Sequence, residues 1–208
     1  MRFPFVVFDM DGVIVDSEAV HELATVSYLR HIGVELDVGE LTRSMYGRRT
    51  LDLSRALAAR IGRPAGEVYE GRELIGQDLR PMPGLREAIG RLRRAGIRLA
   101  LATSATRGYA DQVLRALSLT EDFEVAVTGD DVRNGKPDPE IYLLAAFRLA
   151  ADPTHCAAVE DSPNGVASAA AAGMHAVAVP NDATRGLRFP GAAAVVAGLA
   201  GAAEHLLS

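Results

Sequence analysis

The sequence predicts an α/β fold: a doubly wound parallel sheet that carries an inserted domain of α-helices. Short, nearly continuous apolar runs alternate with amphipathic segments along most of the chain. This alternation is typical of parallel strands that helices cover on both faces. One long interval after the first apolar run breaks the alternation, because it contains only helical patterns.

Six apolar runs are the candidate strands of the sheet. Each is short, is rich in aliphatic or aromatic residues and ends near a polar or turn residue. The runs are 3–8, 97–103, 123–128, 156–159, 175–180 and 192–197.

Amphipathic segments at 84–96 and 139–150 are predicted to be two of the covering helices. Gly96 and Gly173 follow helical segments, where a residue in the left-handed conformation is common. The Ala-rich segment 191–207 is predicted to be a last strand and helix, because several glycines interrupt it and two polar residues follow.

Between residue 16 and about residue 80 no convincing strand pattern occurs. Helical patterns cover 18–33, 50–62 and 65–79. Since a loop of this length without its own structure is improbable in a compact domain, we predict a helical cap domain at 16–80. The α/β core is then 1–15 and 81–208. Pro81 and Pro83 mark the return to the core, because proline disfavours helix in the residue before it.

The composition of the chain limits its partners and its location. With 208 residues and a net charge of -5, the chain does not resemble a nucleic-acid-binding protein. No segment has the roughly 20 apolar residues that a membrane span needs. The single cysteine, Cys156, excludes an internal disulfide and lies in an apolar run, so we interpret it as a small buried residue. These features favour a cytoplasmic protein.

Polar residues follow four of the predicted strands at their carboxyl ends. They are Asp9 and Asp11, then Thr103 and Ser104, then Lys136, and finally Glu160 and Asp161. Ligands of open parallel sheets bind at this edge. Clustered carboxylates repel one another unless a cation is bound, and Mg²⁺ prefers oxygen ligands. Hydroxyls and a lysine suit phosphoryl oxygens. The sequence therefore predicts a Mg²⁺ site that faces a phosphate site.

Two of these polar segments also have features of simpler or different motifs. Asp-Gly pairs often mark simple turns, but the three remaining polar strand ends favour a functional role for Asp9. The segment "GDDVRNGKP" is not a nucleotide-binding P-loop. It has five residues between its glycines instead of four, and a proline follows the lysine.

Four motifs occur in order at the strand ends: "DMDG" at 9–12, "LATS" at 101–104, "GKPDP" at 135–139 and "VEDSPNG" at 159–165. Together they resemble the haloacid dehalogenase-like phosphohydrolase superfamily, although none is specific alone. The helical insertion between the first two motifs is similar to that of the branch with β-phosphoglucomutase and phosphoglycolate phosphatase-like enzymes.

The resemblance implies a role for each residue at this edge. Asp9 would be the nucleophile that forms an aspartyl-phosphate, and Asp11 the general acid and base. The side chains of Asp9 and Asp161 and the backbone carbonyl of Asp11 would bind Mg²⁺, with Glu160 joining this set directly or through water. Thr103, Ser104 and Lys136 would hold the transferring phosphoryl group.

Three residues of the cap are candidates for substrate contacts. His21 lies about one helical turn beyond Ser17, and in β-phosphoglucomutase-like enzymes a histidine at the matching place contacts the acid/base aspartate; a structural role is the alternative. Arg48 and Arg49 could clamp an anionic group or could belong to a solvated helix start. The mutase has an arginine where Thr50 falls in this chain, and this departure counts against a mutase.

The sequence thus leads to a first hypothesis and to alternatives. The first is a Mg²⁺-dependent hydrolase of a small phosphate monoester, such as a sugar phosphate. The second is a sugar-phosphate mutase, and the third is an inactive protein that binds a phosphorylated ligand. A dehalogenase would need neither Asp11 nor a metal. We expect a monomer whose partner is a small phosphorylated metabolite, and neither nucleic acid nor membrane.

Overall fold

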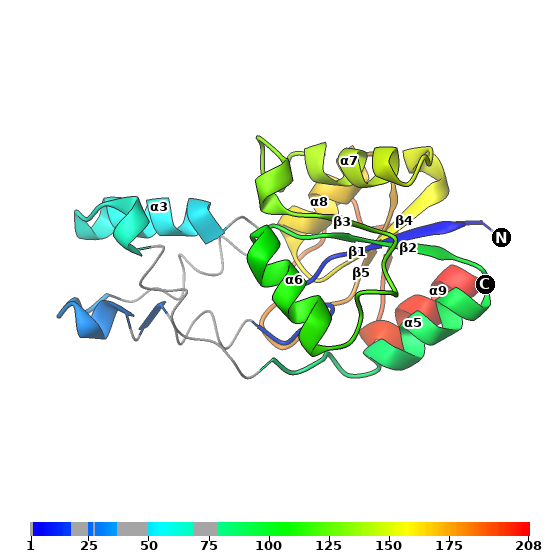
Figure 1. The fold of residues 1–208 in the computed structure, drawn as a ribbon, viewed down its shortest axis with the longest axis horizontal. Coiled ribbons are helices and arrows are strands. Elements are labelled where there is room, and N and C mark those ends of the chain that lie inside the picture. The colour runs from blue at the N-terminus through cyan, green and yellow to red at the C-terminus, as the bar shows by residue number, and fades with distance from the viewer. Residues whose placement is uncertain (1, 18–24, 27, 37–49, 69–78) are drawn as a thin grey trace.

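The structure, a computed structural model, describes residues 2–17, 25–26, 28–36, 50–68 and 79–208. In these ranges six parallel strands form one sheet, and helices flank both of its faces (Figure 1). The strands are β1 (Phe5–Phe8), β2 (Arg98–Ala102), β3 (Val125–Val127), β4 (Cys156–Glu160), β5 (His175–Ala178) and β6 (Ala194–Val195). The helices are α3 (Thr50–Ile61), α5 (Leu85–Arg94), α6 (Arg107–Ala116), α7 (Glu140–Arg148), α8 (Pro163–Ala171) and α9 (Gly198–Leu207), with short 3₁₀ turns η1 (Gly129–Asp131) and η2 (Pro153–His155).

The order of the strands in the sheet is β3-β2-β1-β4-β5-β6. From β1 the chain builds the sheet first on one side and later on the other, so β1 and β4 flank the topological switch point. Phe8, the last residue of β1, is in register with Leu101 of β2 and Val159 of β4. The residues that follow these three strands therefore come out at the same edge.

Two apolar layers cover the sheet. On one face, alternate strand residues such as Val6 and Phe8 pack with α5, α6 and α9. On the other face, residues such as Val7 and Ala158 pack with α7 and α8. Because both faces are covered, the strands need almost continuous apolar sequence, and every residue of β4 is buried.

The six predicted strands and the doubly wound sheet are confirmed. The observed strands lie inside the predicted runs, except that β4 extends by one residue to Glu160. The two glycines expected after helices, Gly96 and Gly173, have φ values of 78° and 81°. The Ala-rich end of the chain forms β6 and α9, as predicted.

The described part of the predicted cap is helical. It contains α3, helical residues at 28–31 and 65–68, and a small apolar cluster of its own that includes Tyr28, Leu57 and Val68. In Figure 1, α3 lies apart from the sheet and its covering helices. The remainder of the pattern predicted at 65–79 lies outside the described residues.

The segment that leaves the sheet region for the predicted cap and the segment that returns from it are hydrogen-bonded to each other. Val15 and Pro81 form an antiparallel bridge, Asp16 N donates to Arg80 O at 2.9 Å, and Met82 N donates to Ile14 O at 2.9 Å. These bonds tie the two connections together at the place where the sequence predicted the boundary of the cap. The boundaries themselves stay predictions.

None of the helices in the described ranges has both the length and the apolar character that crossing a membrane requires.

A pair of histidines joins the start of β5 to the last turn of α9. His175 Nε2 and His205 Nε2 are 2.9 Å apart, while the ring centroids are 5.2 Å apart and the planes differ by 11°. The two Nε2 atoms are within hydrogen-bond distance, so one ring donates N–H and the other accepts. Burial, then His205 and Arg2, lower the pKa of His175.

We expect the contribution of the His175–His205 pair to the unfolding free energy to depend on pH. Because the folded pKa of His175 lies below its ordinary value of 6.5, the contribution is complete above about pH 6.5 and is lost as the pH falls toward the folded pKa. Between about pH 7.5 and 5.5 the wild type should lose up to about 1 kcal/mol more unfolding free energy than His205→Gln, in urea titrations followed by circular dichroism. The variant of the exposed His155, His155→Gln, should behave as wild type; equal pH profiles for all three proteins would refute the prediction.

Candidate active site at the carboxyl edge of the sheet

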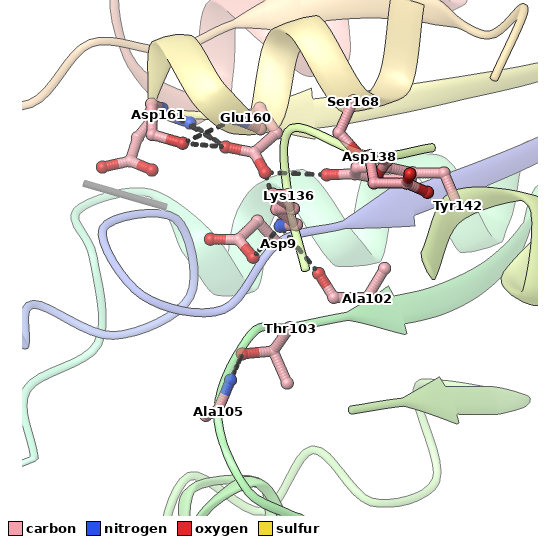
Figure 2. A network of polar contacts seen from close by, with 12 residues as sticks. Asp9, Ala102, Thr103, Ala105, Lys136, Asp138, Tyr142, Glu160, Asp161 and Ser168 are labelled. Atoms are coloured by element: carbon pink, nitrogen blue, oxygen red, sulfur yellow. Dashed lines mark hydrogen bonds and ion pairs between the residues drawn. The ribbon is translucent and has the colours of Figure 1, made fainter. Parts of the chain in front are cut away.

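Asp9 begins the loop after β1 and lies at the centre of a buried polar network (Figure 2). Its backbone N–H donates to Val159 O at 3.0 Å, which continues the ladder between β1 and β4 by one residue. The residue is 4% exposed, and Oδ1 accepts a hydrogen bond from Lys136 Nζ at 2.6 Å. The network thus holds one oxygen of the carboxylate in a fixed place.

Lys136 reaches this edge from the segment between β3 and α7. Its Nζ donates to Asp9 Oδ1 and to Glu160 Oε1, both at 2.6 Å, and to Ala102 O at 3.1 Å. These three acceptors match the three N–H groups of an ammonium. Nζ also lies 5.1 Å from the centroid of the Tyr142 ring, a cation–π distance. Burial alone would lower the pKa of Lys136, but the two carboxylates outweigh it and hold this pKa above its ordinary value.

Glu160, the last residue of β4, accepts hydrogen bonds at both oxygens. Oε1 accepts from Lys136 Nζ and, at 2.8 Å, from the hydroxyl of Tyr142. Oε2 accepts from the backbone N–H of Asp161 and from both the N–H and the hydroxyl of Ser162. A Cβ at Gly165 would lie 1.8 Å from Oε1, so the first turn of α8 has room only for glycine here.

Asp161 follows β4 and lies against the loop after β1. Its Oδ2 accepts from Asn181 Nδ2 at 2.8 Å. Gly12, with φ of +77°, lies so close that a Cβ there would be 2.1 Å from this oxygen. Glycine is therefore required at this position both for its backbone conformation and for the close approach of Asp161.

The carboxylates of this site can hold a cation. Ligand oxygens of Asp9, Glu160 and Asp161 lie within 4.8 Å of one another, and all three residues are buried. Among the described residues of the cluster, Lys136 supplies one positive charge to three carboxyl groups. Burial raises the pKa of Asp9 to about 8, Lys136 opposes this shift, and Glu160 and Asp11 add to it. A hard divalent cation fits this set, because it would bind the oxygens and relieve the excess of negative charge.

Thr103 and Ser104 follow β2 at the same edge. Thr103 is fully buried, its N–H donates to Val127 O at 3.0 Å, and its Oγ1 accepts from Ala105 N at 3.1 Å. Gly129 supports this turn closely, since its N–H donates to Ala105 O and a Cβ would lie 2.5 Å from Ser104 O. Figure 2 shows Thr103 just past the end of β2, on the side of the network where Asp9 lies.

Asp11 lies in the turn that leads from β1 to the predicted cap. Ile14 N and Val15 N both donate to Met10 O, and these bonds fold the turn back on itself. The hydroxyl of Ser17, itself 1% exposed, donates to Asp11 Oδ1. The candidate acid/base residue Asp11 is thus held by Ser17, which lies just beyond the bridge between Val15 and Pro81.

The structure brings together the core residues that the sequence singled out. Asp9, Lys136, Glu160 and Asp161 form one cluster, although their roles are not tested by this placement. His21, Arg48 and Arg49 lie outside the described residues. Burial raises the pKa of the Cys156 thiol to about 11, which agrees with an unreactive buried cysteine.

Two residues of the site were missed in the sequence. Tyr142 lies six residues after Lys136, in the segment 139–150 that was predicted only as a covering helix. Asn181 follows a predicted strand directly after a proline, and that position at the carboxyl edge was the available signal.

Comparisons with known proteins agree with this geometry. The model of the haloacid dehalogenase-like hydrolase family matches residues 4–173. A phosphorylated carbohydrates phosphatase of Thermotoga maritima is 36% identical over 184 residues, which cover 83% of this chain and 82% of that protein. A β-phosphoglucomutase of Bacillus subtilis is 31% identical, with coverage of 84% and 82%. A crystal structure of CbbY from Rhodobacter sphaeroides in complex with xylulose 1,5-bisphosphate is 27% identical, with a TM-score of 0.83 and coverage of 95% of each chain.

The family match spans most of the chain and all four strand-end motifs, and several relatives exceed 30% identity over more than four fifths of it. The chain therefore belongs to the haloacid dehalogenase-like hydrolase family.

Proposed function

We propose that this protein is a Mg²⁺-dependent hydrolase of small phosphate monoesters, with sugar phosphates as the substrate class, and that it works through an aspartyl-phosphate. The observation that carries the proposal is the buried carboxylate of Asp9, which Lys136 holds at Oδ1 within reach of Glu160 and Asp161. The phosphatase and mutase names of the relatives support the substrate class.

Asp9 is the nucleophile in this proposal. Lys136 favours its ionised form and fixes Oδ1, so attack on phosphorus falls to Oδ2. As the new P–O bond forms, the bond to the ester oxygen breaks and its electron pair leaves with the alcohol. Asp9 and Asp161, with the backbone carbonyl of Asp11, would hold Mg²⁺, which supplies positive charge to the carboxylates and to the phosphoryl oxygens.

Asp11 handles the protons. In the first half it donates a proton to the departing alcohol, and in the second half its carboxylate takes a proton from water as the water attacks phosphorus. The P–O bond to Asp9 then breaks, which releases inorganic phosphate and restores the carboxylate. Thr103, Ser104 and Lys136 line the edge where the phosphoryl oxygens would be held during both transfers.

Glu160 acts in this proposal as a brace and not as a direct metal ligand. Both of its oxygens are already engaged, by Lys136 and Tyr142 on one side and by the Asp161–Ser162 segment on the other. Direct ligation would require it to give up some of these buried bonds. Glu160 instead fixes Lys136 beside Asp9 and shapes the turn that carries Asp161.

We assign the inserted helical region the role of a cap that closes over the active site. Residues 16–80 form a cap over the core of 1–15 and 81–208, and the paired connections at Val15 and Pro81 act as its hinge. Closure would exclude water and bring His21, Arg48 and Arg49 to the substrate. A monomeric, cytoplasmic protein is the expected form.

The mutase is the second candidate, because a β-phosphoglucomutase is among the relatives. In a mutase the phosphoryl group on Asp9 passes to a sugar hydroxyl, so both activities share the first step. They differ in the nucleophile that Asp11 deprotonates in the second step.

The first prediction of this proposal concerns the nucleophile and the cation. Asp9→Asn should lower phosphate release from a panel of sugar phosphates by at least about a thousandfold, because an amide cannot form the acyl phosphate. Chelation of Mg²⁺ by EDTA should abolish release by the wild type, and added Mg²⁺ should restore it. The variant Glu121→Gln, at an exposed acid outside the cluster, should keep wild-type rates. Substantial turnover by Asp9→Asn would exclude Asp9 as the nucleophile.

The same panel separates the two candidate activities. A hydrolase releases one inorganic phosphate for each ester consumed, measured with a colorimetric phosphate assay and by ³¹P NMR. A new sugar-phosphate isomer that accumulates with little free phosphate would instead establish a mutase.

The contacts by which Glu160 supports Lys136 predict that two variants lose different amounts of unfolding free energy. Tyr142→Phe removes one hydrogen bond and should lower the unfolding free energy by about 1 kcal/mol. Glu160→Gln breaks the buried pair with Lys136 and should lower it by about 3 kcal/mol. Urea unfolding of both variants measures the difference, and the exposed Phe147→Ser serves as a control that should change little. A Glu160→Gln protein as stable as wild type would contradict the brace.

A further inference from the structure

Asn181 stands where the segment after β5 meets the candidate metal site. Its Nδ2 donates to Asp161 Oδ2 at 2.8 Å. An ideal Cβ on Gly12 would lie 2.1 Å from that oxygen and 2.5 Å from Asn181 Nδ2. The loops after β1, β4 and β5 therefore touch at one point, and the hydrogen bond between Asn181 and Asp161 lies at that contact.

The orientation of the Asn181 amide follows from its own partners. Its Oδ1 accepts from the backbone N–H groups of Ala183 at 2.9 Å and Thr184 at 3.1 Å, and from the hydroxyl of Thr184 at 3.2 Å. The hydroxyl of Thr184, a fully buried residue, also accepts from the N–H of Asn181 at 3.1 Å. Since two backbone donors require the oxygen on this side, the NH₂ group must face Asp161.

We propose that Asn181 is a positioning residue for the divalent cation: it orients the carboxylate of Asp161 and thereby sets the affinity of the site for Mg²⁺. This inference rests on the proposed function. A donor on Oδ2 fixes the plane of the carboxylate and the direction of its other oxygen. Partners of this kind typically change metal affinity 10- to 100-fold when they are removed.

The chemistry of an amide suits this position. An ammonium or guanidinium in its place would neutralise part of the charge that the cation needs. The amide donates a hydrogen bond and carries no net charge, so Asp161 keeps its negative charge for the ion. Lys136, by contrast, interacts with Asp9 and Glu160.

A purely structural role for Asn181 is the alternative, because its Oδ1 also closes the turn to Thr184. The two roles differ in the ion selectivity that they predict. Mg²⁺ demands near-octahedral geometry at about 2.1 Å, whereas Ca²⁺ accepts looser and more variable coordination. Loss of orientation should therefore weaken Mg²⁺ binding more than Ca²⁺ binding, and loss of the turn alone should weaken both alike.

The experiment uses the full chain and compares wild type, Asn181→Ala and Thr184→Val. Isothermal titration calorimetry gives the Kd for Mg²⁺ and for Ca²⁺, and the rise in Tm with each ion gives an independent measure that needs no substrate. Thr184→Val is the matched control, because it removes the hydroxyl bonds of the same turn and leaves the amide of Asn181 in the chain.

Asn181→Ala should raise the Kd for Mg²⁺ by about tenfold or more and the Kd for Ca²⁺ by a clearly smaller factor. Thr184→Val should lower the Tm of the metal-free protein with a smaller change in the Kd for Mg²⁺. An unchanged Kd for Mg²⁺ in Asn181→Ala, an equal loss for both ions, or an equal effect of Thr184→Val would each overturn the inference. If the wild type itself binds no Mg²⁺, the proposed function fails first, so the two failures are distinguishable.

Discussion

The buried ammonium of Lys136 is the contact on which the arrangement of the site depends. It joins Asp9 of the β1 loop, Glu160 of β4 and the last carbonyl of β2, three adjacent segments of the sheet. Without it the buried carboxylates at this edge would repel one another at close range in a medium of low dielectric. With it they still outnumber the positive charge among the described residues, and Asp9 keeps a raised pKa of about 8. The protein thus stabilises the cluster only in part, and the remaining imbalance is what a divalent cation can correct.

The sheet topology explains why such distant residues meet. Parallel strands end at a common edge, and the reversal of strand order at β1 and β4 opens space there for a ligand. Small residues then permit close approach: Gly12 admits Asp161, and Gly165 admits Glu160. Either position with a Cβ would push a carboxylate away from the cluster, so these glycines are as much a part of the site as the acids.

The sequence was sufficient for the sheet and for the core of the cluster because both follow from periodicity and strand ends. Apolar runs identify strands such as β1 and β4, and polar residues directly after them must lie at the carboxyl edge. The partners of those residues could not be found in this way. Tyr142 reaches Glu160 from a helix, and Asn181 reaches Asp161 from a turn, so both contacts depend on how separate segments pack. Nor could a motif reveal that Glu160 has both oxygens engaged, since that requires the donors of Ser162 and Lys136 in place.

The family includes relatives named as phosphatases and a mutase, and the position of Asp11 gives a physical reason why one core can serve both. In the proposed mechanism, Asp9 forms the aspartyl-phosphate at the sheet edge, and Asp11 protonates the departing alcohol. In the proposed second transfer, the product depends on which nucleophile Asp11 deprotonates. The hydroxyl of Ser17, just beyond the bridge between Val15 and Pro81, donates to Asp11. Asp11, the proposed acid/base residue, is therefore tied to the segment that enters the proposed cap, whereas Asp9, the proposed nucleophile, directly follows β1. In this proposal, changes in the inserted region can change the acceptor of the second step from water to a sugar hydroxyl, while Asp9 and Asp11 keep their roles in the first step.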